Sequence, residues 1–246
     1  MGAVIKRVTT ARVVWITRPH GQGENLCRLL ESTGARAIRF PVIEIVPVRE
    51  KPDVQQLSRA VRQSHLVIFV SRNAVVCAGS VIPDFYKIIY GKQVLAIGAG
   101  TRAALAAKGL VDVVSPDSGI GSEALLELEQ LHPEALAGGS ILVVRGVGGR
   151  DKLAAALGQD GIAVEYLEVY ERRRPEVAVQ TLENIWHDTP PDAIILTSVE
   201  GLHNLIKMTP AAHTERLLRT RLVVMSARIE SAARSLGYTA ETMVSS

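Results

Sequence analysis

Residues 13–18 read Val-Val-Trp-Ile-Thr-Arg, and residues 141–145 read Ile-Leu-Val-Val-Arg. Both are apolar runs that end in an arginine, and these arginines, Arg18 and Arg145, lie 127 residues apart. Four further pairs share this offset to within one residue: Gly34 with Gly161, Ser71 with Ser198, Gly98 with Ser226, and Gly109 with Gly237. A repeat this long indicates a duplicated domain and not a solenoid. We therefore expect the 246 residues to form two related domains.

Each copy alternates short Val- and Ile-rich runs with helical patterns. The short runs lack period-two alternation, which is typical of strands buried on both faces of a parallel sheet. The helical segments carry apolar residues at spacings of three and four, which predicts one apolar stripe facing the sheet. Two such stripes are Leu26, Leu29, Leu30 and Thr33, and Ile229, Ala232, Ala233 and Leu236. The pattern predicts a doubly wound α/β sheet in each repeat.

Two extended stretches interrupt this alternation at equivalent places in the repeat, residues 39–48 and residues 164–172. The second alternates apolar and polar residues, as a strand with one solvated face does. We interpret the two stretches as paired linkers that join the domains and allow a hinge. A helix expected from Ser122 would have its mate near position 250, beyond Ser246, so either the second copy lacks this helix or the sequence is shortened.

Composition limits the functional classes. The chain is 47% hydrophobic, and no apolar run approaches the roughly 20 residues of a membrane span. Met1–Arg12 lacks the hydrophobic region of a secretory signal, so we expect a soluble cytoplasmic protein with no membrane association. Cys27 and Cys77 have apolar neighbours and are expected to be buried. With a net charge of +3 and 4% aromatic residues, a small anionic ligand is favoured over nucleic acid.

Polar residues and glycines follow the predicted strands. Ligands of open α/β sheets bind beyond the carboxyl ends of the strands, where helix N-terminal amides attract anions. The candidate binding residues at these places are Thr17, Arg18, Ser71, Asn73, Gly98, Thr101, Arg145, Gly146, Ser198, Ser226 and Arg228. Ser71, Thr101 and Ser198 are equally compatible with a simple helix-capping role.

Three further patterns bear on chemistry. Gly98–Ala103 matches the loose dinucleotide pattern, but the next predicted strand is followed only by Asp117, a poor candidate for the ribose-binding acid. The six histidines show no metal-ligand spacing, so no metal is predicted. Tyr170 lies on the second linker, expected to face the space between the domains. Its phenol could donate a proton to a leaving group, or it could be an ordinary strand aromatic.

The chain resembles the uroporphyrinogen-III synthase family along nearly its whole length. Each motif is weak alone, and their order and spacing carry the resemblance. The motifs are Ile16–Pro19, Pro41–Ile45, Phe69–Val75, Ile97–Thr101, Gly121–Leu125, Val144–Gly146, Leu167–Tyr170 and Leu196–Ser198. One departure is Ile229, which stands where the first copy has the hydroxyl of Thr101.

The resemblance implies two flavodoxin-like doubly wound domains joined by a two-stranded β linker. Residues 1–40 with 171–246 would form one domain, and residues 41–170 the other. The implied reaction closes the linear tetrapyrrole hydroxymethylbilane to uroporphyrinogen III, with loss of water, inversion of the last ring and no cofactor. Tyr170 would assist departure of the hydroxyl, and the candidate binding residues, with Ser122, would hold the substrate carboxylates.

We also expect a monomer. Some relatives carry further domains, including DNA-binding ones, so a second hypothesis stays open. In that alternative the chain is a synthase-like module of a longer transcriptional regulator, and it senses a tetrapyrrole without converting it.

Overall fold

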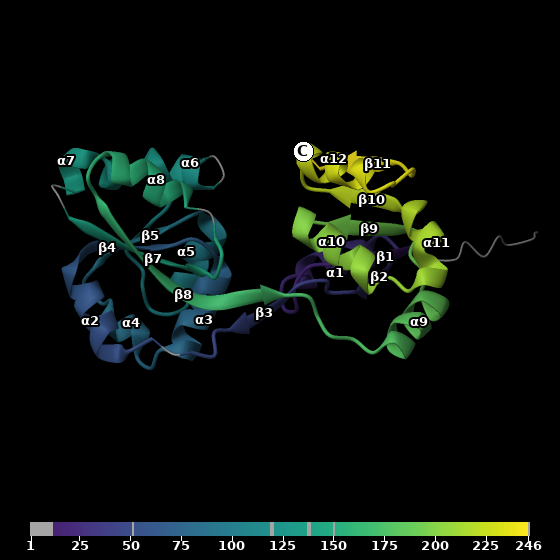
Figure 1. Cartoon of the computed structure of the whole chain (residues 1–246), viewed down its shortest axis with the longest axis horizontal. Coiled ribbons are helices and arrows are strands. Elements are labelled where there is room, and N and C mark those ends of the chain that lie inside the picture. The colour runs from purple at the N-terminus through teal and green to yellow at the C-terminus, as the bar shows by residue number, and fades with distance from the viewer. Residues whose placement is uncertain (1–11, 51, 119–120, 137–138, 150, 246) are drawn as a thin grey trace, which may run out of the picture. The chain divides into compact units, whose positions relative to one another are not determined.

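A computed structural model describes residues 12–50, 52–118, 121–136, 139–149 and 151–245 (Figure 1). The stretch Met1–Arg12, expected not to be a secretory signal, lies outside these residues apart from Arg12. The chain divides into two compact units. Unit 1 comprises Met1–Glu44 and Arg173–Ser246, and unit 2 comprises Ile45–Arg172. Each unit is built around its own parallel sheet.

Unit 1 has a five-stranded sheet. In spatial order its strands are β11 (Thr242–Val244), β10 (Arg221–Val224), β9 (Ala193–Leu196), β1 (Val13–Ile16) and β2 (Arg36–Arg39). All four neighbouring pairs are parallel. Numbered along the unit's own sequence, the order is 2-1-3-4-5, the flavodoxin-like arrangement. This confirms the predicted doubly wound sheet.

The helices of unit 1 alternate with these strands. They are α1 (Glu24–Ser32), α9 (Val179–Asp188), α10 (Val199–Met208), α11 (Thr214–Leu218), α12 (Ala227–Ser235) and the 3-10 turn η2 (Ala211–His213). On one face of the sheet, Val14, Ile16 and Ile195 pack against Cys27 of α1. Leu29, predicted in the apolar stripe of this helix, is 64% exposed. The helix instead turns Cys27, Leu26 and Leu30 toward the sheet. The centre of this buried stripe lies about 100° around the helix axis from Leu29.

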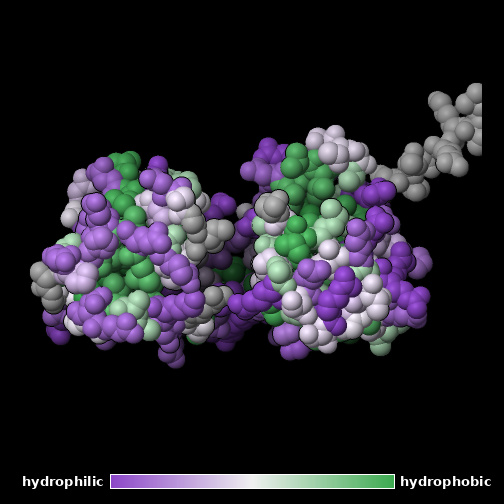
Figure 2. All heavy atoms as spheres, turned by 90° about the horizontal axis from the view of Figure 1, so that it is seen from above, coloured by the Kyte–Doolittle hydropathy of each residue, from purple (hydrophilic) through white to green (hydrophobic). Residues whose placement is uncertain are grey.

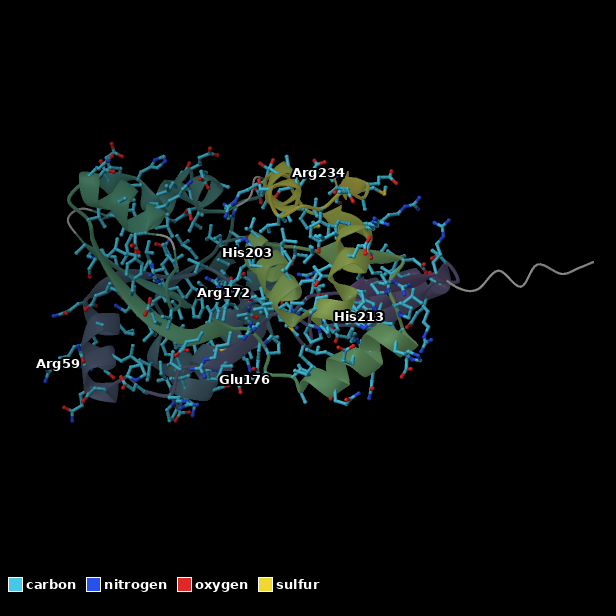
Figure 3. All side chains as sticks on the ribbon, turned by 45° about the vertical axis from the view of Figure 1, so that its right-hand side comes forward. Arg59, Arg172, Glu176, His203, His213 and Arg234 are labelled. Atoms are coloured by element: carbon cyan, nitrogen blue, oxygen red, sulfur yellow. The ribbon has the colours of Figure 1, made fainter. Side chains whose placement is uncertain are left out.

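An aromatic cluster packs on the opposite face of β1. Trp15 stacks on Phe40 at 4.3 Å between ring centroids and meets the edge of Trp186 from α9 at 4.7 Å. The indole Nε1–H of Trp15 donates to the Thr189 carbonyl over 2.8 Å. His213, labelled in Figure 3, stacks on Trp186 at 5.2 Å. Both tryptophans of the chain therefore belong to the core of unit 1.

Unit 2 contains a six-stranded sheet. Its spatial order is β3 (Glu44–Pro47), β8 (Ala163–Arg173), β7 (Ser140–Gly146), β4 (Ser64–Phe69), β5 (Gln93–Ala96) and β6 (Val113–Val114). Without β3 the spatial order is β8-β7-β4-β5-β6. If β7 and β8 are numbered first, as β1 and β2 are in unit 1, this is again the order 2-1-3-4-5. β3 and β8 come from the two predicted linker stretches, and they pair, with the Val48 N–H donating to the Val169 carbonyl over 3.2 Å.

Helices cover both faces of the unit 2 sheet (Figure 1). One face is covered by α2 (Val54–Gln63), α3 (Arg72–Val81), α4 (Phe85–Ile88) and α5 (Ala99–Ala106). The other is covered by α6 (Ser122–Leu126), the 3-10 turn η1 (Glu129–Leu131), α7 (Pro133–Leu136) and α8 (Lys152–Gln159). Along β7, Leu142 and Val144 face the α3 side, whereas Ile141 and Val143 face the α8 side.

The marker glycines of the repeat adopt one conformation. Gly34, Gly109, Gly161 and Gly237 follow α1, α5, α8 and α12 with φ of 85°, 88°, 75° and 90°. This left-handed geometry ends a helix at little cost only for glycine. Gly34 thus ends its helix as Gly161 does, and Gly109 as Gly237 does, as the repeat predicts.

Unit 1 exposes several large apolar side chains. Figure 2 shows hydrophobic residues gathered in the middle of the visible face of unit 1, with hydrophilic residues around them. The most exposed large apolar side chains among the described residues of this unit are, in descending order, Val179, Leu29, Met243 and Met225. Within the residues that the structure describes, no helix is both long and apolar enough to cross a membrane.

Candidate functional site

The carboxyl end of β4 in unit 2 leads directly into a capped helix. Ser71 is the N-cap of α3, and its Oγ accepts a hydrogen bond of 3.0 Å from the Ala74 N–H. A serine hydroxyl has one proton to donate and two lone pairs to accept. The proton of Ser71 is therefore not used by the cap and is free for a second partner.

Tyr170 on β8 is that second partner. Its hydroxyl lies 3.2 Å from Ser71 Oγ, with either oxygen able to donate. The ring is only 5% exposed, so Tyr170 is not displayed on an open strand surface. It lies directly over Gly146, where a Cβ would be 2.6 Å from the tyrosine Cζ. Gly146 thus provides the space in which the tyrosine ring reaches Ser71.

A register shift precedes Tyr170. Along the β7–β8 pair, Arg145 is opposite Glu168, but Gly146 is opposite Tyr170, so Val169 is an additional residue on β8. A one-residue shift moves the following side chain to the other face of the sheet. Tyr166 packs with the α8-side core, whereas Leu167, Val169 and Tyr170 all belong to the α3-side core. The shift is the reason that Tyr170 faces α3 and Ser71.

Arg145, an expected binding residue, already has partners within unit 2. Its side chain is 9% exposed and paired with two carboxylates, at 2.8 Å from Asp151 Oδ1 and 3.1 Å from Glu168 Oε1. The guanidinium carbon lies 3.8 Å from the centre of the Tyr166 ring. Burial by itself would lower the pKa of Arg145, but the hydrogen bonds to Asp151 and Glu168 raise it above its ordinary value. The cation at the end of β7 is thus buried and already paired with two more exposed carboxylates.

The remaining candidates of unit 2 lie near other strand ends. Gly98 is the N-cap of α5, and its backbone leaves this helix terminus uncovered by a side chain. Thr101 is 5% exposed and lies inside α5, so it is not a cap. Asn73 is half-buried in the first turn of α3, and Ser122 is the first residue of α6. Ser71 therefore fits the capping alternative, and Thr101 does not.

Unit 1 has a corresponding set of residues at its strand ends. Ser198 caps α10 by accepting a 2.9 Å bond from the Gly201 N–H, as Ser71 does in unit 2. Thr17 is buried, and its hydroxyl donates to the Ile195 carbonyl over 2.6 Å. Ser226 precedes α12 and makes no capping bond within that helix. Arg18 and Arg228 are exposed.

The departure at Ile229 has a clear structural position. Ile229 is the third residue of α12, and Thr101 is the third residue of α5. Both are buried, at 4% and 5% exposure. At the third position of equivalent helices, unit 1 therefore buries an apolar side chain and unit 2 buries a hydroxyl side chain.

The sequence interpretation missed Asp151, Glu168 and Tyr166. A usable signal existed for Glu168, because it stands two residues before Tyr170, on the same predicted strand. Asp151 follows the glycine-rich turn after Gly146, and no spacing rule links it to Arg145. Asp151 and Tyr166 are recognised only once β7 and β8 are paired.

A separate cavity of about 830 Å³ lies at the amino ends of the unit 1 strands. Arg12, Arg216, Arg219 and Arg221 line it. Arg219 pairs with Glu215 at 2.8 Å, and Arg221 lies 3.5 Å from Glu241. Because helix N-termini face the carboxyl ends of the strands, this cavity lacks the backbone donors of the opposite end. In the described part of the chain, no group of three His, Cys, Asp or Glu residues could hold a metal ion.

Two flavodoxin-like units with hydroxyls and helix N-termini at their strand ends define a two-domain α/β protein. The sequence model of the family described as "Uroporphyrinogen-III synthase HemD" matches residues 24–245. The chain therefore belongs to the uroporphyrinogen-III synthase family.

The chain is also similar to individual uroporphyrinogen-III synthases in sequence and in fold. The chain is 34% identical to the uroporphyrinogen-III synthase of Salmonella typhimurium over 229 residues, which cover 92% of each protein. It is 30% identical to that of Escherichia coli over 236 residues, again 92% of each protein. The fold is similar to a uroporphyrinogen-III synthetase structure from Helicobacter pylori, with a TM-score of 0.63, 13% identity and coverage of 95% and 92%. A mutant synthase structure from Thermus thermophilus gives a TM-score of 0.57 at 21% identity, covering 96% and 93%.

Proposed function

We propose that this chain is a uroporphyrinogen-III synthase, whose two units are the two domains of the enzyme. It converts hydroxymethylbilane to uroporphyrinogen III, with loss of water and inversion of the last ring. The observation that carries this proposal is the family match across residues 24–245. The reaction is a dehydration with ring closure and involves no net oxidation or reduction, so it requires no redox cofactor.

The substrate is a polycarboxylate, and the strand ends of both units offer suitable partners. Helix N-termini bind anions through free backbone N–H groups and the helix dipole. In unit 2 the proposed binding residues are Ser71, Asn73, Gly98, Thr101, Ser122 and Gly146. In unit 1 they are Thr17, Arg18, Ser198, Ser226 and Arg228. Arg145 is left out of this set because its guanidinium is already paired with Asp151 and Glu168.

Tyr170 is the proposed catalytic residue. Its phenol donates a proton to the departing hydroxyl of the substrate, which leaves as water. The Ser71 hydroxyl, which accepts a hydrogen bond from the Ala74 N–H, donates a hydrogen bond to the phenolate oxygen that results and keeps its own proton. The cationic azafulvene left on the substrate attacks the last ring within the same molecule. Loss of a proton from the closed ring system restores the tyrosine, so the cycle balances.

Holding the substrate folded is the larger part of the task. The reacting carbons belong to one molecule, and the effective concentration of correctly oriented groups accelerates such closures strongly. The bound conformation decides which carbon of the last ring is attacked. Type III product requires the inverted ring, whereas unassisted closure gives the type I isomer.

The assay of this proposal is product analysis with freshly generated hydroxymethylbilane. The oxidised products are separated by isomer type and compared with a reaction without protein. Conversion to the type III isomer supports the synthase. Formation of type I alone contradicts it and favours the sensing module instead. We further propose a cytoplasmic location, which the two buried free cysteines support. We also propose a monomer, which sedimentation equilibrium tests.

A further inference from the structure

We propose that Arg145 is a positioning residue: paired with Glu168, it fixes the register shift on β8 that turns Tyr170 toward Ser71. This inference rests on the proposed function of Tyr170. It assigns Arg145 a role different from binding the carboxylates of the substrate.

The first support is the position of the pair in the ladder. Arg145 and Glu168 form the last regular partners of β7 and β8 before the additional residue Val169. Gly146 and Tyr170 form the next partners, on the opposite face of the sheet. Bulges of this kind are rare between parallel strands, and they often re-aim a side chain beside an active site. Without the shift, Tyr170 would face α8 and lie away from Ser71.

The second support is the geometry of the guanidinium. Nε and Nη2 of Arg145 both approach Glu168 Oε1, at 3.2 Å and 3.1 Å. Nη1 reaches Asp151 Oδ1 at 2.8 Å, just before α8 begins. The side chain thus connects the turn after β7 to β8 through three short contacts. A planar group that donates in several directions and stacks on Tyr166 is needed, and lysine cannot replace it.

The third support concerns charge and access. A substrate carboxylate would have to reach a guanidinium that is 9% exposed and already in contact with Asp151 and Glu168. Gly149 closes over the same group, with its Cβ position 3.4 Å from the arginine Cζ. The tyrosine, in contrast, lies on the other face of the sheet. Arg145 therefore acts on the reaction through the backbone of β8.

The test is a double-mutant cycle with steady-state kinetics on hydroxymethylbilane. The variants are Arg145→Lys and Glu168→Gln, each alone and each combined with Tyr170→Phe. Misplacement of a reacting group by about 1 Å costs about 10²-fold, so we expect each single variant to lower kcat by about that factor. KM should stay within about twofold, because binding of the substrate is not changed. In the Tyr170→Phe background neither change should lower kcat further.

Arg59→Lys is the matched control. Arg59 is an exposed arginine on α2 of the same unit, and it points outward in Figure 3. It should keep the wild-type kcat and KM. If Arg145→Lys fails to fold by circular dichroism, Glu168→Gln decides, since Glu168 is 36% exposed and its amide keeps the hydrogen-bond acceptor.

The outcomes separate this inference from the proposed function. If Tyr170→Phe is slow but Arg145→Lys and Glu168→Gln keep full kcat, the positioning role is overturned and the role of Tyr170 stands. If Arg145→Lys raises KM, and still does so beside Tyr170→Phe, Arg145 binds substrate and the inference is again overturned. If Tyr170→Phe is as fast as the wild type, the proposed chemistry of Tyr170 fails, and the inference fails with it.

Discussion

Replacing Gly146 by alanine tests the placement of Tyr170 with a single methyl group. The added Cβ would lie 2.6 Å from Cζ, 2.7 Å from Cε2 and 3.0 Å from the hydroxyl oxygen of Tyr170. The φ of Gly146 is outside the left-handed region, so alanine can adopt this backbone. The cost is therefore steric, and it falls on the tyrosine ring.

The magnitude follows from these distances. Carbon atoms in contact prefer about 3.5–4.0 Å, so the ring must retreat by about 1 Å. Such a shift is expected to break the 3.2 Å contact between the hydroxyl and Ser71 Oγ. A displacement of this size in a reacting group lowers kcat by about 10²-fold. Overpacking should also lower the free energy of unfolding by about 1–3 kcal/mol.

The assay combines kcat and KM for type III product with urea unfolding of the same preparations. Gly158→Ala is the control, because Gly158 lies in α8 with no atom within 4 Å of its Cβ position. It should keep full activity and gain about 0.5–1 kcal/mol in unfolding free energy. A Gly146→Ala variant that folds and retains wild-type kcat would refute the link between this glycine, Tyr170 and the reaction.

Three other predictions follow from the two cores. Gly79→Ala places a Cβ 2.9 Å from Cε2 of Tyr86, so urea unfolding should show a loss of about 1–3 kcal/mol, and a stability equal to the wild type would contradict the packing. Both tryptophans lie in unit 1, so tryptophan fluorescence reports the unfolding of that unit. In Gly79→Ala we expect its urea midpoint to stay at the wild-type value, while circular dichroism shows an earlier transition. A shifted fluorescence midpoint would show that the units unfold together. Burial raises the pKa of Tyr86 to about 12, above its ordinary 10, so the folded state keeps a proton that the unfolded chain loses. Stability should therefore fall as the pH rises from about 10 to about 12, and Tyr86→Phe should fall less over this range.

Much of the fold was predictable because its signals are periodic. Unalternating Val and Ile runs identified β4, β7 and β9 as buried parallel strands. Glycines at a constant offset marked the ends of α1 and α8, since only glycine adopts their φ without strain. These features depend on local geometry, which a sequence records directly. The prediction that Leu29 faces the sheet was wrong. Apolar spacings of three and four residues do not decide which of two neighbouring rows of helix side chains packs on the sheet.

The candidate site was predictable only in part. Ser71 and Ser198 follow strands in both copies, so their positions at helix N-termini could be read from the sequence. The contact between Ser71 and Tyr170 could not, because residues 164–172 alternate like a regular strand and give no sign of the shift at Val169. The engagement of Arg145 was hidden for a related reason. An ion pair between neighbouring strands depends on their register, and that register appears only when β7 lies beside β8.

The equivalence of the strands has a consequence for the way the chain is shared between its units. The first copy of the repeat supplies β1 and β2 to unit 1, but β4, β5 and β6 to unit 2. The second copy supplies β7 and β8 to unit 2, and β9, β10 and β11 to unit 1. The two copies have thus exchanged their first halves, which is a domain swap within one polypeptide. A chain cut between α7 and β7, at the boundary between the copies, would yield two fragments that each lack part of both sheets, so neither could fold without the other.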